Sequence, residues 1–153
     1  MSLIIQLGLN LFPIKCGVPQ GSILGPLLFL LYINDLSTVS NDLFSILFAD
    51  DSNMFTIGKN INDMCTKMNT ALVDIEEWLH CNKLSLNVLK THYMIFTPRN
   101  KVVNDIDLLI CNTAIHRVYV TKFLGVQIDS KLTWKNHIEY TCKKLPKNYK
   151  SLS

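Results

Sequence analysis

The stretch that decides the fold is LFSILFADDSNMFTI, which spans residues 43–57. Residues 43–49 form a short apolar run that stops at two adjacent aspartates, Asp50 and Asp51. Residues 52–57 then resume with side chains that alternate between the two faces of a strand. Two short strands around an acidic turn predict a β-hairpin with a carboxylate pair at its turn.

The carboxylate pair is the first candidate for chemistry. Two adjacent carboxylates repel each other, and partial burial of their turn increases the repulsion. A divalent cation makes the arrangement favourable, and hard carboxylate oxygens select Mg²⁺ or Mn²⁺. In a two-metal site such ions activate an attacking oxygen and stabilise the leaving one in phosphoryl transfer. Aspartate also favours ordinary turns, which is the alternative, but the apolar strand that leads into Asp50 and Asp51 favours the metal site.

A strand end, a loop and a helix are expected before the hairpin. Residues 12–16 read as the end of a strand, and a loop rich in breakers, Gly17–Ser22, follows them. The loop opens a helix that extends to about Ser37, with Ser22 as its cap and Pro26 in its first turn. Since this helix is apolar nearly all round, the sequence predicts that it is buried.

A second helix and several short strands are expected after the hairpin. Asn60 can cap a helix that ends near Asn82, and its apolar residues have amphipathic spacing: Ile61, Met64, Cys65, Met68, Leu72, Ile75 and Leu79. Short strands joined by tight turns, such as Asn112-Thr113, are predicted at residues 91–97, 106–111, 115–120 and 122–129. A last helix over residues 134–144 should end at Pro146. Helices together with antiparallel hairpins indicate one continuous α+β domain.

The composition is that of a globular protein, with 48% hydrophobic and 18% charged residues. The five cysteines are widely spaced and show no zinc-ligand pattern, so we expect reduced thiols in an intracellular protein, cytoplasmic or nuclear. The longest apolar run, residues 23–33, is far shorter than the ~20 residues that a membrane span needs, so no membrane partner is expected.

The net charge of +3 hides an uneven distribution. Residues 1–80 contain 3 Lys/Arg and 8 Asp/Glu, and residues 81–153 contain 12 Lys/Arg and 4 Asp/Glu. An acidic half followed by a basic half suits a metal site beside a phosphate-binding surface. Two solvated faces of opposite sign are the alternative.

Three further features are candidates for binding. The loop Gly17–Gly21 opens a helix and could present backbone N–H groups to a phosphate or a base pair, although a simple turn would look the same. Lys90 stands just before a strand and could reach a pyrophosphate leaving group, or be a solvated lysine. Gly125 lies inside an apolar stretch, which indicates either close approach of another backbone or a bulge.

The order of these motifs resembles reverse transcriptases of non-LTR retrotransposons, of the LINE or Jockey-like type. The resemblance covers about residues 10–145. The matching stretches are the template- and nucleotide-positioning motif with its continuation (residues 12–29 and 32–36), the aromatic-x-Asp-Asp metal turn (48–51), the next palm motif (84–91), and the primer grip with the start of the thumb (123–138).

The resemblance implies a role for each matching residue. Asp50 and Asp51 would hold the catalytic metals, Mg²⁺ or Mn²⁺, and Lys90 would serve the leaving pyrophosphate. Pro19, Gln20 and Gly21 would line the nucleotide and template pocket. Phe123, Leu124 and Gly125 would seat the primer end. The implied partners of the full-length enzyme are an RNA template, a DNA primer and a deoxynucleoside triphosphate.

The chain also departs from the family pattern. The family palm takes another metal-binding aspartate from a strand upstream of the Gly17–Gly21 loop, whereas the first acidic residue here is Asp35. We therefore expect residues 1–145 to form a partial palm, with an antiparallel sheet packed on two helices and the start of a thumb at its end. The fingers and the first metal-ligand strand would be missing, and residues 146–153 would be a tail.

The expected function is that of a reverse transcriptase domain, an RNA-directed DNA polymerase that uses two-metal nucleotidyl transfer but is inactive alone. The alternatives are a non-catalytic nucleic-acid-binding remnant and a decayed retrotransposon reading frame. Without the upstream strand, the hairpin of residues 43–57 would have an unpaired neighbour, so we also expect a sticky, marginally stable protein.

Overall fold

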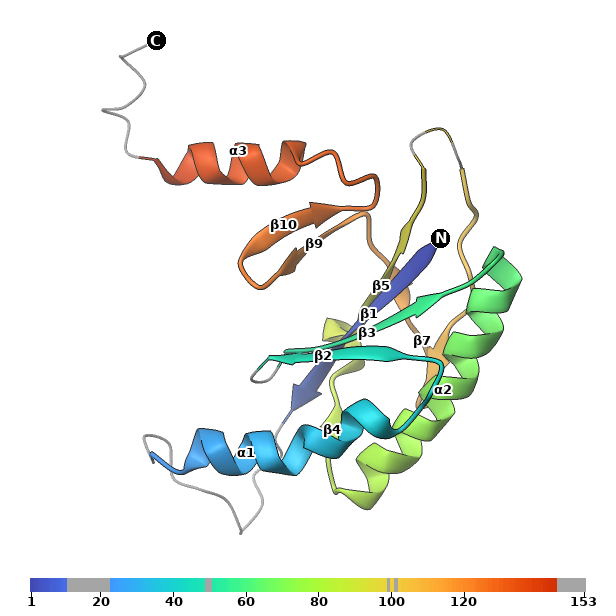
Figure 1. Cartoon of the computed structure of the whole chain (residues 1–153), viewed down its shortest axis with the longest axis vertical. Helices are drawn as coiled ribbons and strands as arrows, with labels where there is room; N and C mark the ends of the chain where they lie inside the picture. Colours follow the sequence, from blue (N-terminus) through green and yellow to red (C-terminus); the bar gives the residue numbers. More distant parts are fainter. Residues whose placement is uncertain (11–22, 49–50, 99, 101, 146–153) are drawn as a thin grey trace.

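The computed structural model describes residues 1–10, 23–48, 51–98, 100 and 102–145 (Figure 1). Its elements are, in chain order, β1 (Ser2–Asn10), α1 (Gly25–Ile33), the 3₁₀ helix η1 (Asn34–Thr38), β2 (Phe44–Phe48), β3 (Asp51–Ile57), α2 (Ile61–Cys81), β4 (Ser85–Leu86), the 3₁₀ helix η2 (Val88–Lys90), β5 (His92–Phe96), β6 (Leu109–Ile110), β7 (Thr113–Ala114), β8 (His116–Arg117), β9 (Val120–Phe123), β10 (Val126–Asp129) and α3 (Lys135–Lys144). The predicted hairpin of residues 43–57 is confirmed as β2 paired antiparallel with β3.

Strand β1 is the centre of the main sheet, whose order is β2-β3-β1-β5-β8, with β4 paired to the end of β1. It runs antiparallel to both β3 and β5. The expectation that the hairpin would lack a neighbour is therefore wrong. The alternating residues Leu3, Ile5 and Leu7 explain why this segment is a strand, since each is buried on the same face. The sheet is mixed rather than purely antiparallel, because β8 pairs parallel to β5.

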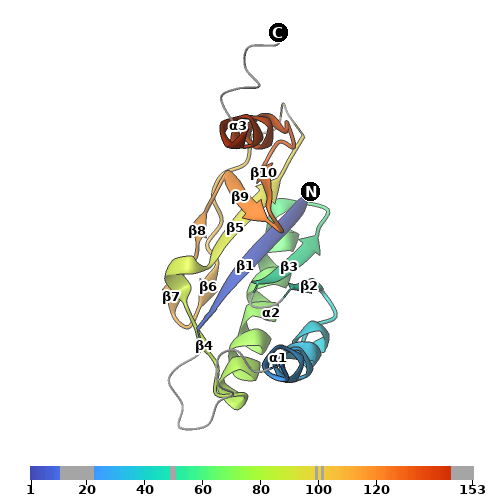
Figure 2. The same cartoon turned by 90° about the vertical axis from the view of Figure 1, so that its left-hand side faces the viewer.

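Helix α2 covers one face of the sheet and forms the core with it (Figure 2). Asn60 caps the helix as predicted, since its side-chain oxygen accepts a hydrogen bond of 2.8 Å from the Asp63 N–H. The predicted apolar stripe is confirmed: five of its residues are buried, and Ile61 and Cys65 pack at the edge. The buried residues that the sheet contributes are Leu3, Ile5, Leu7, Met54, Tyr93 and Ile95.

Helix α1 differs from the expectation of a buried helix. Ile33 is its only described residue that is buried, and leucines such as Leu27 and Leu31 are 55% and 67% exposed. The helix begins after Leu24, without a side-chain cap, and Pro26 lies in its first turn as expected. An all-round apolar helix has no preferred inner face, and the chain buries the following 3₁₀ turn instead, through Leu36. The main sheet therefore packs on α2 and η1 rather than on two long helices.

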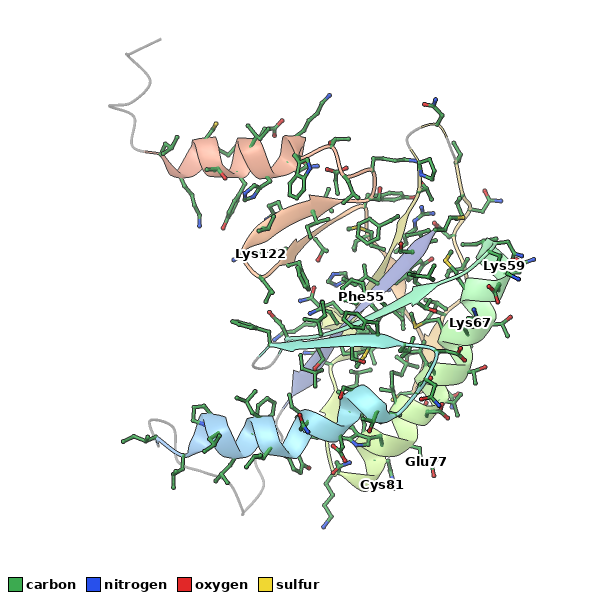
Figure 3. All side chains as sticks on the ribbon, viewed as in Figure 1. Phe55, Lys59, Lys67, Glu77, Cys81 and Lys122 are labelled. Atoms are coloured by element: carbon green, nitrogen blue, oxygen red, sulfur yellow. The ribbon has the colours of Figure 1, made fainter. Side chains whose placement is uncertain are left out.

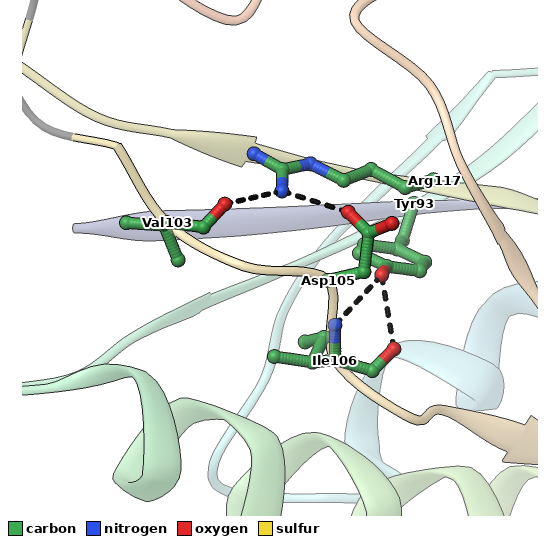
Figure 4. Close-up of polar contacts among 5 residues, drawn as sticks. All are labelled: Tyr93, Val103, Asp105, Ile106 and Arg117. Atoms are coloured by element: carbon green, nitrogen blue, oxygen red, sulfur yellow. Dashed lines mark hydrogen bonds and ion pairs between the residues drawn. The ribbon is translucent and has the colours of Figure 1, made fainter.

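A network of hydrogen bonds fixes residues 102–108, which precede β6 and have no regular structure (Figure 4). The Tyr93 hydroxyl donates to the Ile106 carbonyl at 2.9 Å and accepts from the Ile106 N–H at 3.0 Å. The Arg117 guanidinium donates to the Val103 carbonyl at 2.8 Å and to the Asp105 carboxylate at 2.9 Å. Through these bonds the segment closes over the edge of the core at β8.

The C-terminal part contains a β-hairpin and a helix. Residues 122–129 were predicted to be one strand, but Leu124 and Gly125 form a two-residue turn between β9 and β10, and both have positive φ. A Cβ at Gly125 would have no neighbour within 4 Å, so this glycine serves the turn and not a close approach. The predicted last helix is confirmed as α3.

Asp129 organises the turn from β10 into α3. Its buried carboxylate accepts hydrogen bonds from the N–H groups of Lys131, Thr133 and Trp134 and from the Thr133 hydroxyl. Burial raises the pKa of Asp129, but these hydrogen bonds, led by those from Thr133, outweigh burial and leave the pKa below its usual value. Trp134, which precedes α3, is held at φ 65° and is 52% exposed.

No helix among the described residues is both long and apolar enough to cross a membrane.

Candidate active site

The structure describes part of the predicted site. Asp51, Lys90, Phe123, Leu124 and Gly125 are described, whereas Pro19, Gln20, Gly21 and Asp50 lie outside the described residues. The described residues come from β3, η2 and the β9–β10 hairpin. These elements bring the residues together if they all lie on the same face of the main sheet.

Asp51 is the first residue of β3 and pairs with Gly8 of β1. Alternation along a strand puts Asp51, Asn53 and Phe55 on the face opposite the one covered by α2. The Asp51 carboxylate is partly buried. Among the described residues, it accepts one hydrogen bond, a long one of 3.4 Å from the Gln6 side-chain amide. The described residues therefore leave most of the hydrogen-bond acceptor capacity of the Asp51 carboxylate unused.

Lys90 reaches this face because Gly8 has no side chain. A Cβ built on Gly8 would lie 2.5 Å from the Lys90 Cβ and 2.9 Å from the Asn87 carbonyl oxygen. The Gly8 N–H donates to the Thr91 hydroxyl at 3.2 Å, and the Asn87 N–H donates to the Gly8 carbonyl. Thus η2 is seated on the β1 residue that pairs with Asp51. The Lys90 side chain itself is exposed.

The β9–β10 hairpin lies over the same face of the sheet (Figures 1 and 2). Phe123 packs edge-on against Phe55, with ring centroids 6.2 Å apart at an angle of 86°. Figure 3 labels Phe55 on β3, beneath the hairpin. Leu124 and Gly125 are exposed at the turn. The structure therefore gathers Asp51, Lys90 and Phe123 on one face, although their roles remain predictions.

A row of polar side chains crosses this face, and the sequence reasoning missed it. Gln6 stands between Asn53 on β3 and His92 on β5 in the strand register. Asn53 is 1% exposed, and its amide nitrogen has no hydrogen-bond partner among the described residues. Burial lowers the pKa of His92, while the hydrogen bond with the Lys90 carbonyl opposes this effect. A glutamine within the apolar run of residues 3–9 was the available signal.

The oxygen atoms around Asp51 meet part of the needs of a divalent cation. Asp51 offers hard carboxylate oxygens, as Mg²⁺ and Mn²⁺ prefer, and Asp50 precedes it in the chain. The neighbouring strand β1 has no acidic residue. Within the ranges that the structure describes, no three acidic, histidine or cysteine side chains are close enough to hold a metal together. The chemistry of the pair fits a metal, but a complete site needs further oxygen ligands.

A comparison with protein families identifies the relatives of the chain. The model of the family described as "Reverse transcriptase (RNA-dependent DNA polymerase)" matches residues 4–128. The chain belongs to the reverse transcriptase family. The match includes most of β1, the β2–β3 hairpin, η2 and most of the β9–β10 hairpin, which are the elements that build the candidate site.

Relatives of known name come from fruit-fly retrotransposons. The chain is 29% identical over 133 residues to the RNA-directed DNA polymerase from mobile element jockey of Drosophila melanogaster, which covers 82% of the chain and 14% of the relative. It is 29% identical over 129 residues to the probable RNA-directed DNA polymerase from transposon X-element, and 25% identical over 137 residues to that from transposon BS, both of the same species. These matches cover 82% and 85% of the chain.

The chain spans about 14% of the length of the first two relatives. No solved structure matches the chain. The comparisons therefore establish a reverse transcriptase domain of the retrotransposon type. They do not establish the activity of a whole polymerase for this chain.

Proposed function

We propose that this domain carries the catalytic carboxylates of a polymerase that copies an RNA template into DNA by two-metal nucleotidyl transfer. The observation that supports this most is the position of Asp51. Its side chain is partly buried at the start of β3, next to the central strand β1, on the face where η2 and the β9–β10 hairpin meet. A carboxylate with open acceptor capacity in such a place suits a metal better than a simple surface turn.

Each part of this face has a proposed task. Asp50 and Asp51 hold Mg²⁺ or Mn²⁺, which when bound supplies Lewis-acid stabilisation of the attacking and leaving oxygens. Lys90 offers an exposed ammonium group toward the pyrophosphate of a deoxynucleoside triphosphate. The β9–β10 turn, with Phe123 anchored on Phe55 and with Leu124 and Gly125 exposed, seats the primer end. We also propose that Pro19, Gln20 and Gly21 line the nucleotide and template pocket.

We further propose that residues 1–145 act as a partial palm with the start of a thumb, that residues 146–153 are a tail, and that the chain does not extend primers alone. Two carboxylates from one turn supply fewer ligands than two metals need. Among the described residues no group of three acidic, histidine or cysteine side chains could hold a metal ion. Primer extension by the purified chain, lost in Asp50→Ala, would contradict the inactivity.

The metal site can be tested on the chain itself. We expect the chain to bind Mn²⁺, which can be followed by water-proton relaxation. Asp51→Asn should raise the dissociation constant by about tenfold or more, because a direct ligand of the metal is lost. Asp42→Asn is the matched control, since Asp42 is an exposed aspartate just before β2 of the same hairpin. Equal Mn²⁺ affinity in Asp51→Asn and the native chain would contradict the proposed site.

A basic surface on the C-terminal part supports a second candidate function, the gripping of nucleic-acid phosphates without catalysis. The Lys144 ammonium lies 4.5 Å from the centre of the Tyr140 ring. A hydrogen bond with Lys144, together with the charges of Lys122 and Lys144, lowers the pKa of Tyr140. These three residues bring two cations and an aromatic ring together, which suits contact with a nucleic-acid backbone.

Salt dependence tests this second function. We expect the chain to bind a primer–template duplex, and the double variant Lys122→Ala with Lys144→Ala to lower the slope of log K against log salt by about 2, one for each phosphate contact. The control is Lys59→Ala with Lys67→Ala, because Figure 3 shows both lysines on the far side of the molecule from Lys122. Equal slopes in the two double variants would exclude the Lys122 and Lys144 surface.

A further inference from the structure

We propose that Gln6 is a positioning residue for Asp51, and that Thr121 and His92 hold Gln6 in place from strands β9 and β5. This inference rests on the proposed function, since it concerns how the carboxylate of the candidate metal site is aimed. Gln6 lies on the central strand β1, which has no acidic residue, and Gln6 belongs to no catalytic motif.

The hydrogen bonds form a continuous chain across four elements. The Gln6 amide nitrogen donates to the Asp51 carboxylate at 3.4 Å, and the Gln6 oxygen accepts from the Thr121 hydroxyl at 3.3 Å. The Thr121 oxygen is 2.7 Å from Nε2 of His92. The other ring nitrogen of His92 is 3.2 Å from the Lys90 carbonyl oxygen. The chain of hydrogen bonds thus runs from Asp51 through Gln6 and Thr121 to His92 on β5.

The chemistry of each group fixes how Gln6 must point. A carboxylate only accepts hydrogen bonds, so the NH₂ end of the amide must face Asp51 and the oxygen must face Thr121. Thr121 has one hydroxyl proton, and it can donate this proton to the Gln6 oxygen while its own oxygen accepts one from Nε2 of His92, when Nε2 carries a proton. In that tautomer Thr121 bridges Gln6 and His92, so the β9–β10 hairpin is tied to the side chain that meets Asp51.

The fold gains little from a glutamine at this position. Residues 3–9 of β1 are otherwise apolar or glycine, and a leucine at residue 6 would continue that pattern. The amide nitrogen of the neighbouring Asn53 is buried and has no hydrogen-bond partner in the part of the chain that the structure describes, which is unfavourable in a folded protein. A polar row that is only partly satisfied, on the face that carries Asp51, is expected at a functional site rather than in a structural core.

The consequence is that the hairpin proposed to seat the primer and the carboxylate proposed to hold the metal share one hydrogen-bond chain. Residues that orient a metal ligand typically change metal affinity by 10- to 100-fold when they are lost. The Gln6–Asp51 bond is long, so the lower end of this range applies. Thr121 acts only through Gln6, so replacing Thr121 should lower metal affinity less than replacing Gln6. Replacing both residues should lower it no more than replacing Gln6 alone.

The first experiment measures Mn²⁺ binding to the full chain. We expect Gln6→Leu to weaken binding about tenfold and Thr121→Val about threefold, with Thr121→Ser close to native and the Gln6→Leu, Thr121→Val double variant no weaker than Gln6→Leu alone. Gln127→Leu, on β10 and outside the chain of hydrogen bonds, is the control for a glutamine replaced by leucine. Thermal unfolding checks that every variant folds.

Native Mn²⁺ affinity in Gln6→Leu, with binding lost in Asp51→Asn, would overturn this inference and leave the proposed function standing. A second measurement needs no metal. The side-chain amide signals of Gln6 in a ¹⁵N–¹H spectrum should move in both Asp51→Asn and Thr121→Val, and not in Asp42→Asn. Gln6 signals that stay in place in these variants would overturn the inference, even if the protein binds no Mn²⁺. Gln6 signals that move in a protein that binds no Mn²⁺ would support the row of hydrogen bonds and refute the proposed metal site.

Discussion

Asp51→Asn is expected to lower primer extension by about three orders of magnitude when it is introduced into a full polymerase that contains this domain. The amide keeps the shape of the carboxylate but removes its negative charge and weakens it as a ligand for a hard cation. A catalytic metal contributes several kcal/mol of charge stabilisation in the transition state. Since each 1.36 kcal/mol corresponds to a factor of ten, a loss of about 4 kcal/mol gives this magnitude.

The measurement is single-turnover extension of a labelled primer on an RNA template, with Mg²⁺ and then Mn²⁺. Asp42→Asn again provides the control, because it changes an exposed aspartate at the other end of the same hairpin. The rate, and not only the apparent affinity for the nucleotide, should fall, since a ligand of the catalytic metal acts on the transition state. A polymerase that keeps a tenth or more of its rate would show that Asp51 is not such a ligand.

The sequence predicted the elements whose patterns are local. The α2 stripe repeats at helical spacing and has a capping asparagine at its start, and the β2–β3 hairpin alternates around an acidic turn. Such patterns are set by neighbours along the chain, so they survive into the structure. The order of the motifs then identified the family, because each match restricted the spacing of the next.

The elements that sequence reasoning missed depend on distant partners. Strand β1 reads as an apolar terminus, and only its pairing with β3 and β5 makes it the centre of the sheet. Helix α1 is apolar on every side, so its composition predicts burial but does not specify a neighbour.

The polar row of the candidate site was missed for the same reason. Gln6, Asn53 and His92 are far apart in the sequence, and the register of three strands alone brings them together. Conversely, Asp51 and Lys90 stand in recognisable motifs, so the sequence alone names them as candidate site residues. Gln6, which is proposed to position Asp51, stands in no such motif.

Gly8→Ala is expected to have the second large effect, on stability and on the site together. The added Cβ would lie 2.5 Å from the Lys90 Cβ and 2.9 Å from the Asn87 carbonyl oxygen, and neither is the far end of a flexible side chain. Overpacking of this kind typically costs 1–3 kcal/mol. The shift of η2 would also strain the hydrogen bonds of Gly8 with Thr91 and Asn87. We therefore expect the free energy of unfolding to fall by about 3 kcal/mol.

Urea unfolding of the chain measures this loss, and Gly125→Ala separates its cause. Gly125 has φ +87° and open space around it, so alanine there introduces backbone strain of about 1–2 kcal/mol without a clash. Gly8→Ala introduces a clash, and it should therefore destabilise more than Gly125→Ala. If Gly8→Ala lowered the free energy of unfolding by the same amount as Gly125→Ala, or by less, η2 would not be packed directly against Gly8. The path by which Lys90 reaches the face of Asp51 would then need another explanation, since that close approach is what joins the two residues in one site.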